Sequence, residues 1–358
     1  MVRFLPLTVT EVRRETRDSV VLTLEPRALD RDAFDFLPGQ YLTFRKSIEG
    51  EELRRSYSIC SMRGNGHIQV GIKKVPDGLF STWANEQLAP GEALEAMAPM
   101  GSFTTAFLPT EARHHLFFAA GSGITPVLSL VKSVLKREPK SRVTLVYGNR
   151  SSSSIMFREE LEDLKNLHLG RFTLLHILTR ESQEIDLFNG RIDGQKCAQL
   201  FRYWIDPAGV DQAFICGPQS MMTSVSQALR EAGLGEHQIK FELFASGQQT
   251  RRRRQAEEGG STSSAQACQA TVQLDGRSRS FEMKKGEISI LDAAMAEGLD
   301  VPYACKGGVC STCRAMLLEG EVDMDANFAL EDYEVRRGYI LTCQSYPATD
   351  RVVVDYDQ

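Results

Sequence analysis

Apolar and polar residues alternate over short segments in the first hundred residues of the chain. The clearest cases are residues 7–16 (LTVTEVRRET), 19–26 (SVVLTLEP) and 68–75 (IQVGIKKV), with Pro and Gly turns between segments. A period of two places one face of each strand in a core and the other in solvent. Several short strands of this kind, separated by turn residues, predict an antiparallel β-barrel.

The pattern changes between residues 114 and 245, where apolar strand runs alternate with helical stretches. The strand runs are 114–120, 142–148, 172–179 and 211–217, and the helical stretches are 126–137, 157–166 and 221–233. Strands that read as continuous apolar runs are typical of sheets covered by helices on both faces. This part of the chain is therefore predicted to be an α/β domain with a parallel sheet.

A third region follows residues 247–267, which have almost no apolar side chains and no period. They predict a flexible linker of about 20 residues with a reach of roughly 25 Å. Beyond it, residues 271–283 predict a hairpin around Asp275-Gly276, and residues 289–298 predict a short helix. With 358 residues the chain is expected to be multidomain: a barrel (1–107), an α/β domain (108–246), the linker (247–267) and a C-terminal domain (268–358).

Charge and composition exclude several classes of partner. The net charge is −5, and the residues from Ser261 onward include sixteen acidic and nine basic side chains. An acidic C-terminal module argues against nucleic acid and indicates docking on a basic protein surface, or a charge that only keeps the module soluble. The chain has no apolar run of about 18 residues and no signal segment. We expect no membrane insertion, a cytoplasmic location and reduced thiols.

Three of the eight cysteines lie within nine positions near the C-terminus. Their C-x4-C-x2-C spacing, with a fourth cysteine 30 positions later, is that of a plant-type [2Fe–2S] cluster held by four thiolates. Structural zinc is the alternative, but a zinc ribbon brings two C-x-x-C pairs, whereas here one ligand stands alone. The predicted metal ligands are Cys305, Cys310, Cys313 and Cys343.

A candidate cofactor segment, LRRSYSIC, lies in the predicted barrel. An isolated R-x-Y-S is weak, since Arg and Tyr are common on barrel strands. Preceded by PGQ (38–40) and followed by GLFS (78–81), it resembles the flavin-binding pattern of ferredoxin–NADP reductases. The resemblance implies that Tyr57 packs on the flavin ring and Ser58 bonds near its reactive nitrogen. It also implies that Arg55 pairs with the FAD pyrophosphate, with Gly78 and Ser81 completing the cradle.

A second phosphate site is predicted in AAGSGITP, directly after an apolar strand. Small residues at Gly121 and Gly123 allow a pyrophosphate to approach the free amides at a helix N-terminus, and Thr125 lies in the same turn. We place Pro126 at the first helical position. A plain strand-to-helix turn is the alternative, but the G-x-G-x-x-P variant resembles that of the same reductases.

The nucleotide is expected to be NADPH, with NADH less favoured. Arg150 follows the second strand of the α/β domain, where an NAD-selective site would carry an acid, and Arg158 lies eight residues on. A guanidinium accommodates the 2′-phosphate that distinguishes NADPH.

The segment AFICGP supplies Cys216, Gly217 and Pro218 at the end of another strand. Cysteine at a strand end is often only a small buried apolar residue. The resemblance to ferredoxin–NADP reductases implies instead that this C-G-P lies beside the nicotinamide. Ser58 and Cys216 are therefore the predicted catalytic residues.

The last 90 residues resemble plant-type ferredoxins, which implies a β-grasp fold and a one-electron carrier. Almost the whole chain, including GEELRRSYSIC, YGNR, GRIDG and VPYACKGGVC, resembles the family of reductase subunits of bacterial phenylacetyl-CoA epoxidases. This resemblance implies electron flow from NADPH through FAD and [2Fe–2S] to di-iron oxygenase subunits. Related chains serve other oxygenases, acyl desaturases or a hybrid-cluster protein. A redox sensor without turnover is the alternative from another class.

Overall fold

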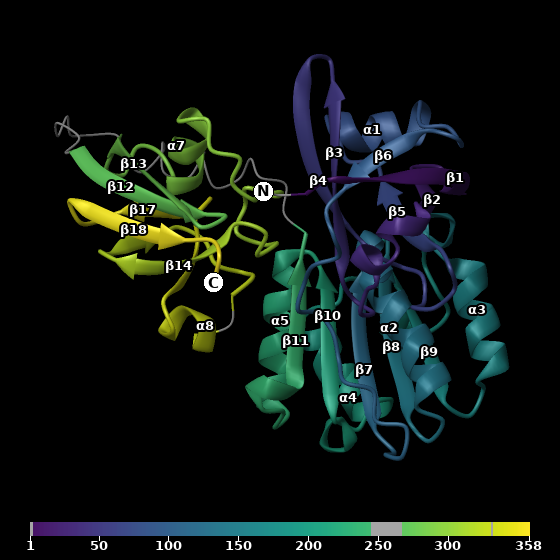
Figure 1. The fold of residues 1–358 in the computed structure, drawn as a ribbon. Helices are drawn as coiled ribbons and strands as arrows, with labels where there is room; N and C mark the ends of the chain where they lie inside the picture. Colours follow the sequence, from purple (N-terminus) through teal and green to yellow (C-terminus); the bar gives the residue numbers. More distant parts are fainter. Residues whose placement is uncertain (1–2, 245–266, 331) are drawn as a thin grey trace. The chain divides into compact units, whose positions relative to one another are not determined.

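The computed structural model describes residues 3–244, 267–330 and 332–358 (Figure 1). The described residues divide into two compact units. One contains residues 5–53 and 57–244, and the other contains the C-terminal residues together with residues 3–4 and 54–56. The predicted linker lies outside the described residues except for its last position, Ala267, which begins a strand. None of the described helices has both the length and the apolar character needed to cross a membrane.

The N-terminal part is an antiparallel six-stranded sheet in the order β4-β3-β6-β1-β2-β5. The three alternating segments named from the sequence form β1, β2 and β5, and the apolar faces of the strands make one core with Phe44, Phe80 and Trp83. Helix α1 packs against β5 and β2. The strands are β1 (Leu5–Thr16), β2 (Ser19–Pro26), β3 (Tyr41–Ile48), β4 (Glu51–Ser58), β5 (Ile68–Lys73) and β6 (Ala93–Ala96), and the helix is α1 (Leu79–Glu86).

The α/β domain has a parallel sheet in the order β11-β10-β7-β8-β9. Helices α2 and α3 share one core cluster with the sheet, and α4 packs against α5. The strands are β7 (His114–Ala120), β8 (Arg142–Asn149), β9 (Phe172–Leu178), β10 (Gln212–Gly217) and β11 (Ile239–Leu243). The helices are α2 (Ile124–Arg137), α3 (Arg158–Leu167), α4 (Gly194–Tyr203) and α5 (Gln219–Glu231).

The C-terminal unit is a mixed sheet in the order β13-β12-β18-β14-β16, with a separate β15-β17 pair. The predicted hairpin joins β12 to β13, and both residues of its turn, Asp275 and Gly276, have positive φ as a type I′ turn requires. The strands are β12 (Ala267–Leu274), β13 (Arg277–Lys284), β14 (Arg314–Glu319), β15 (Val322–Met324), β16 (Tyr339–Leu341), β17 (Ser345–Pro347) and β18 (Arg351–Asp355), and the helices are α7 (Ile290–Ala296) and α8 (Asp332–Arg336).

One local prediction is wrong. Helix α2 begins at Ile124, so Pro126 is its third residue and not its first. A short 3-10 turn, η3 (Gly121–Gly123), leads directly into α2. Proline is tolerated at this position because the first N–H groups of a helix have no intrahelical partner.

Candidate functional site

The four predicted cluster thiols stand as two pairs. The Cys310 side chain is the largest influence on the pKa of Cys305, which is lowered, and the Cys343 side chain is the largest influence on the pKa of Cys313, which is raised. Among the residues that the structure describes, no three His, Cys, Asp or Glu side chains converge on one metal position. Two pairs suit a cluster of two irons, each held by two thiolates, better than a single tetrahedral zinc ion.

The loop around Cys305 favours the thiolate that a metal needs. The hydrogen bond from Cys310 is the largest influence and, with backbone N–H groups of Gly307, Val309 and Cys310, lowers the pKa of Cys305 to about 6 against the effect of burial. The Gly307 N–H donates to Cys305 Sγ at 3.3 Å. Because the thiolate is the form that binds iron, these donors fit the cluster chemistry.

A glycine is required inside this loop. Gly308 has φ +75°, and a Cβ there would lie 2.5 Å from the carbonyl oxygen of Ala326. Both facts exclude larger residues, since the left-handed region and the close approach each disfavour a side chain. The tight loop brings backbone amides to the side of the predicted cluster.

Behind the cysteines, a chain of hydrogen bonds fixes their backbone. The Tyr356 hydroxyl bonds to Thr342 Oγ1 at 2.7 Å, and that hydroxyl donates to the carbonyl of Cys313 at 2.9 Å. Gln344 Nε2 donates to the carbonyl of Lys306 at 3.0 Å and so ties the loop to the turn between β16 and β17 that carries Cys343. The sequence spacing does not reveal these supports.

The glycine turn after β7 is held by a hydrogen bond from the neighbouring strand β8. The hydroxyl of Tyr147, a buried residue of β8, donates to the carbonyl of Gly121 at 2.9 Å, and Gly121 has φ +55°. Open space surrounds the position of a Cβ at Gly121. At Gly123 a Cβ would instead lie 2.2 Å from the carbonyl oxygen of Cys216 in β10. The turn therefore offers an open face for an anion and a closed face against the sheet.

Ser58 and Cys216, predicted as catalytic residues, both lie next to a third residue, Glu242. Ser58 Oγ in the barrel donates to Glu242 Oε2 in β11 at 3.2 Å. Cys216 pairs with Glu242 in the register of β10 and β11. Burial, and then the charge that Glu242 carries once it has ionised, raise the pKa of the Cys216 thiol well above its usual value. A neutral thiol at this place acts by shape and packing, not as a nucleophile.

Glu242 itself is an unusual carboxyl. Burial raises its pKa to about 8, although the bond from Ser58 works in the opposite direction. The carboxyl therefore holds a proton at neutral pH, at a point shared by the barrel and the α/β domain. No motif in the sequence points to Glu242, which lies in the short strand β11.

A stability measurement tests the proton on Glu242. Between the unfolded pKa near 4.5 and the folded value of about 8, the folded protein holds a proton that the unfolded chain has lost. Stability should therefore fall as pH rises through this window, by up to about 1.4 kcal/mol per pH unit from this group. Urea unfolding of Glu242→Gln should show a shallower decline than the wild type between pH 5 and 8. The exposed Glu184→Gln is the control, and parallel profiles for wild type and Glu242→Gln would contradict the account.

The predicted flavin residues lie on β4 and at the start of α1. The Tyr57 ring is half-buried and packs at 5.6 Å from the Phe80 ring, while Arg55 is exposed. The Ser81 hydroxyl is buried, accepts from the Val75 N–H and donates to the Gly78 carbonyl. Its side chain therefore shapes the loop before α1, and the free backbone amides at the start of this helix are the groups left for a phosphate.

Arg150 directly follows β8, and Arg158 is the first residue of α3. The Arg180 N–H donates to the carbonyl of Arg150, so a third arginine, which the sequence did not single out, follows β9 next to them. An acid is also present. Glu181 Oε2 accepts from the backbone N–H of Ser152 at 2.7 Å and from its hydroxyl at 2.9 Å.

The order of strands arranges these groups along one edge. The carboxyl ends of parallel strands meet at the same edge of a sheet, which is where α/β domains bind ligands. Strand β7, with its glycine turn, stands between β10 and β8. Cys216 at the end of β10 and Arg150 at the end of β8 therefore flank the turn on opposite sides. The predicted nicotinamide, pyrophosphate and 2′-phosphate contacts follow one another in that order.

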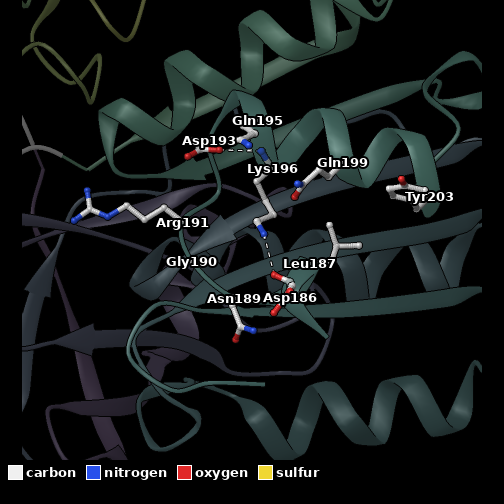
Figure 2. Close-up of a pocket in the computed structure, with 10 residues that line it drawn as sticks. All are labelled: Asp186, Leu187, Asn189, Gly190, Arg191, Asp193, Gln195, Lys196, Gln199 and Tyr203. Carbon is white, nitrogen blue, oxygen red and sulfur yellow. Dashed lines mark hydrogen bonds between the residues drawn. The ribbon is translucent and has the colours of Figure 1, made fainter. Parts of the chain in front are cut away.

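A separate hollow of about 410 Å³ lies between η5 (Asp186–Phe188) and α4 (Figure 2). Lys196, a buried residue of α4, crosses it and donates to the carbonyl of Asp186 at 3.3 Å. Asp193 is bound to the backbone N–H of Lys196 as the N-cap of α4. None of the site residues predicted from the sequence lines this hollow.

Comparisons with known proteins find three family models along the chain. Three family models match: an oxidoreductase FAD-binding domain at residues 6–105, an oxidoreductase NAD-binding domain at 117–227 and a 2Fe-2S iron-sulfur cluster binding domain at 272–348. The solved structure of phthalate dioxygenase reductase has the same fold, with a TM-score of 0.60 and 22% identity over 98% of each chain. The protein is thus a reductase that carries electrons from a nicotinamide nucleotide through FAD to a [2Fe–2S] cluster.

Two relatives with similar sequences identify the family within this class of reductases. One component of the 1,2-phenylacetyl-CoA epoxidase of Escherichia coli K12 is 43% identical over 100% of this chain and 99% of its own length. The ferredoxin reductase component of the 3-ketosteroid-9-alpha-monooxygenase of Rhodococcus rhodochrous is 34% identical over 98% of this chain and 96% of its own. The chain belongs to the family of phenylacetyl-CoA epoxidase reductase subunits.

Proposed function

We propose that this reductase passes electrons from NADPH to the di-iron oxygenase subunits of a phenylacetyl-CoA epoxidase in the cytoplasm. The 43% identity to the Escherichia coli epoxidase component along the entire chain carries this proposal. The two cysteine pairs and the site shared by Ser58, Cys216 and Glu242 support it, because they supply both ends of the electron path. A flavin between them accepts two electrons as a hydride and releases them one at a time.

The proposed modules are those predicted from the sequence: residues 1–107 for FAD, 108–246 for NADPH, 247–267 as linker and 268–358 for the cluster. Within them, Tyr57 and Ser58 face the flavin ring, and Arg55 with the loop of Gly78 and Ser81 binds its pyrophosphate. Gly121, Gly123 and Thr125 receive the NADPH pyrophosphate, and Cys216, Gly217 and Pro218 border the nicotinamide. Arg150 and Arg158 bind the 2′-phosphate. The cluster ligands are Cys305, Cys310, Cys313 and Cys343.

Reconstitution tests the acceptor. The holoprotein is combined with the oxygenase subunits of the Escherichia coli phenylacetyl-CoA epoxidase, NADPH and phenylacetyl-CoA, and epoxide formation is measured. The oxygenase component of the Rhodococcus rhodochrous 3-ketosteroid-9-alpha-monooxygenase serves as the comparison. Turnover with the epoxidase subunits well above that with the ketosteroid system supports the proposal. Equal or better support of the ketosteroid oxygenase overturns it.

Cofactor choice is tested at Arg150. Its guanidinium makes no hydrogen bond or ion pair with another described residue, so it is available for a ligand. If it binds the 2′-phosphate, Arg150→Ala should raise the Michaelis constant for NADPH and leave that for NADH little changed, a difference of about 1.5–3 kcal/mol. Glu181, bound to Ser152 nearby, is the group that would favour the ribose hydroxyls of NADH. An unchanged NADPH/NADH preference in Arg150→Ala argues against this assignment.

A further inference from the structure

A carboxylate of the flavin barrel reaches into the α/β domain where α3 begins. Glu15 Oε1, near the end of β1, accepts the backbone N–H of Phe157 at 2.6 Å, across 142 positions of sequence. The Glu15 side chain is only 8% exposed, and Arg13 Nη1 lies 2.5 Å from its other oxygen. The carboxylate is thus buried, with an N–H donor from the α/β domain on one oxygen and a half-exposed basic partner on the other.

The residue that receives this contact has an uncommon backbone conformation. Phe157 is the N-cap of α3, with φ 58° and ψ 31°, and no side chain of its own helix caps it. The left-handed region is rarely occupied by a bulky aromatic residue and persists where the surroundings enforce it. The barrel supplies that enforcement through the acceptor oxygen of Glu15.

The side chains at the start of α3 also lie close to a strand of the barrel. A Cβ at Gly71 in β5 would lie 3.2 Å from Phe157 Cζ, 3.1 Å from Met156 Cε and 2.8 Å from Thr125 Cγ2. The absence of a side chain at Gly71 thus lets the start of α3 and the first turn of α2 approach the same barrel strand. Phe157 is held on one side by Glu15 and on the other by the backbone of β5.

Arg158 is the next residue and the first of α3. Its guanidinium is bound within the helix to Glu162, with Nε 3.0 Å from Oε1. Because the conformation of Phe157 sets the direction in which α3 starts, it also sets the place from which Arg158 extends. The orientation of this arginine therefore depends on a residue of the other domain.

We propose that Glu15 is a positioning residue for nucleotide binding: a carboxylate of the flavin barrel that fixes the start of α3 and thereby the placement of Arg158. This rests on the proposed role of Arg158 at the 2′-phosphate. It adds that the affinity for NADPH is partly determined by the domain that binds the flavin.

Two measurements on the holoprotein test the proposal. Calorimetry gives the dissociation constant of NADP⁺, and NADPH-dependent dye reduction gives the Michaelis constant and the turnover number. Glu15→Ala should weaken NADP⁺ binding about tenfold and raise the Michaelis constant by a similar factor, with a smaller change in turnover number. Glu15→Asp keeps the charge beside Arg13 but is too short to reach Phe157, so it should show the same weakening even if Glu15→Ala does not fold. The exposed barrel residue Glu25, changed to Ala, is the matched control and should bind as the wild type does.

A double-mutant cycle shows whether Glu15 acts through Arg158. The combined Glu15→Ala/Arg158→Ala protein should bind NADP⁺ no more weakly than Arg158→Ala alone. Fully additive losses would overturn the proposal, as would wild-type affinity in Glu15→Asp. If Arg158→Ala weakens binding and both Glu15 variants do not, the positioning role is wrong while the proposed nucleotide site stands. If Arg158→Ala itself binds normally, the assignment of Arg158 fails, and the role of Glu15 fails with it.

Discussion

Cys313→Ala is expected to abolish the visible absorbance of the iron–sulfur cluster while leaving NADPH-dependent dye reduction largely intact. Cys313 is buried and paired with Cys343, so its loss leaves one iron with a single thiolate. The residues proposed for FAD and NADPH lie in other parts of the sequence, so hydride transfer does not require the cluster. Wild type should contain about two irons per chain and the variant almost none.

Cys268→Ala provides the matched control for this variant. Cys268 is another buried cysteine of the C-terminal unit, on β12 in its hydrophobic core, and is not a predicted ligand. It should retain iron and absorbance. Equal loss of dye reduction and of the cluster in Cys313→Ala would contradict the modular account, and unchanged iron would remove Cys313 from the ligands.

Gly123→Ala is expected to have the largest effect on nucleotide use. The added methyl group would lie 2.2 Å from the carbonyl oxygen and 3.1 Å from Sγ of Cys216. Backbone at that distance must move, so the glycine turn is displaced from the end of β10. We expect the Michaelis constant for NADPH to rise about 100-fold and the stability to fall by about 1–3 kcal/mol.

Gly170→Ala is the control in the same domain. A Cβ at Gly170 meets no atom within 4 Å, and its φ lies outside the left-handed range. Steady-state kinetics with both NADPH and NADH should show the loss in Gly123→Ala for each nucleotide, since the pyrophosphate is common to them. Normal kinetics in Gly123→Ala would place the pyrophosphate elsewhere.

Much of the fold could be read from the sequence because burial imposes clear periods. The run HHLFFAA is β7 itself, and the hairpin at Asp275-Gly276 joins β12 to β13. Helix α4 was not predicted. Its sequence GQKCAQLFRY mixes polar and apolar residues, with Lys196 buried by tertiary packing that no local pattern reveals.

Some residues of the candidate site can also be predicted from the sequence, and others cannot. Cysteine spacing and the glycine turn are local signals, and from them the sequence predicts a cluster and a pyrophosphate contact. Glu242 and Glu15 gain their meaning from contacts across 184 and 142 positions of sequence, with Ser58 and Phe157 respectively. Such contacts depend on how two domains pack, and a single sequence carries no signal for them.

Anaerobic rapid mixing of the holoprotein with NADPH measures the order in which the flavin and the cluster are reduced. Absorbance is followed at wavelengths that separate the flavin from the iron–sulfur cluster. We expect the flavin absorbance to fall first and the cluster to be reduced afterwards, while Cys313→Ala shows the flavin phase alone. Reduction of the cluster before the flavin, or at an unchanged rate in protein depleted of FAD, would contradict the account.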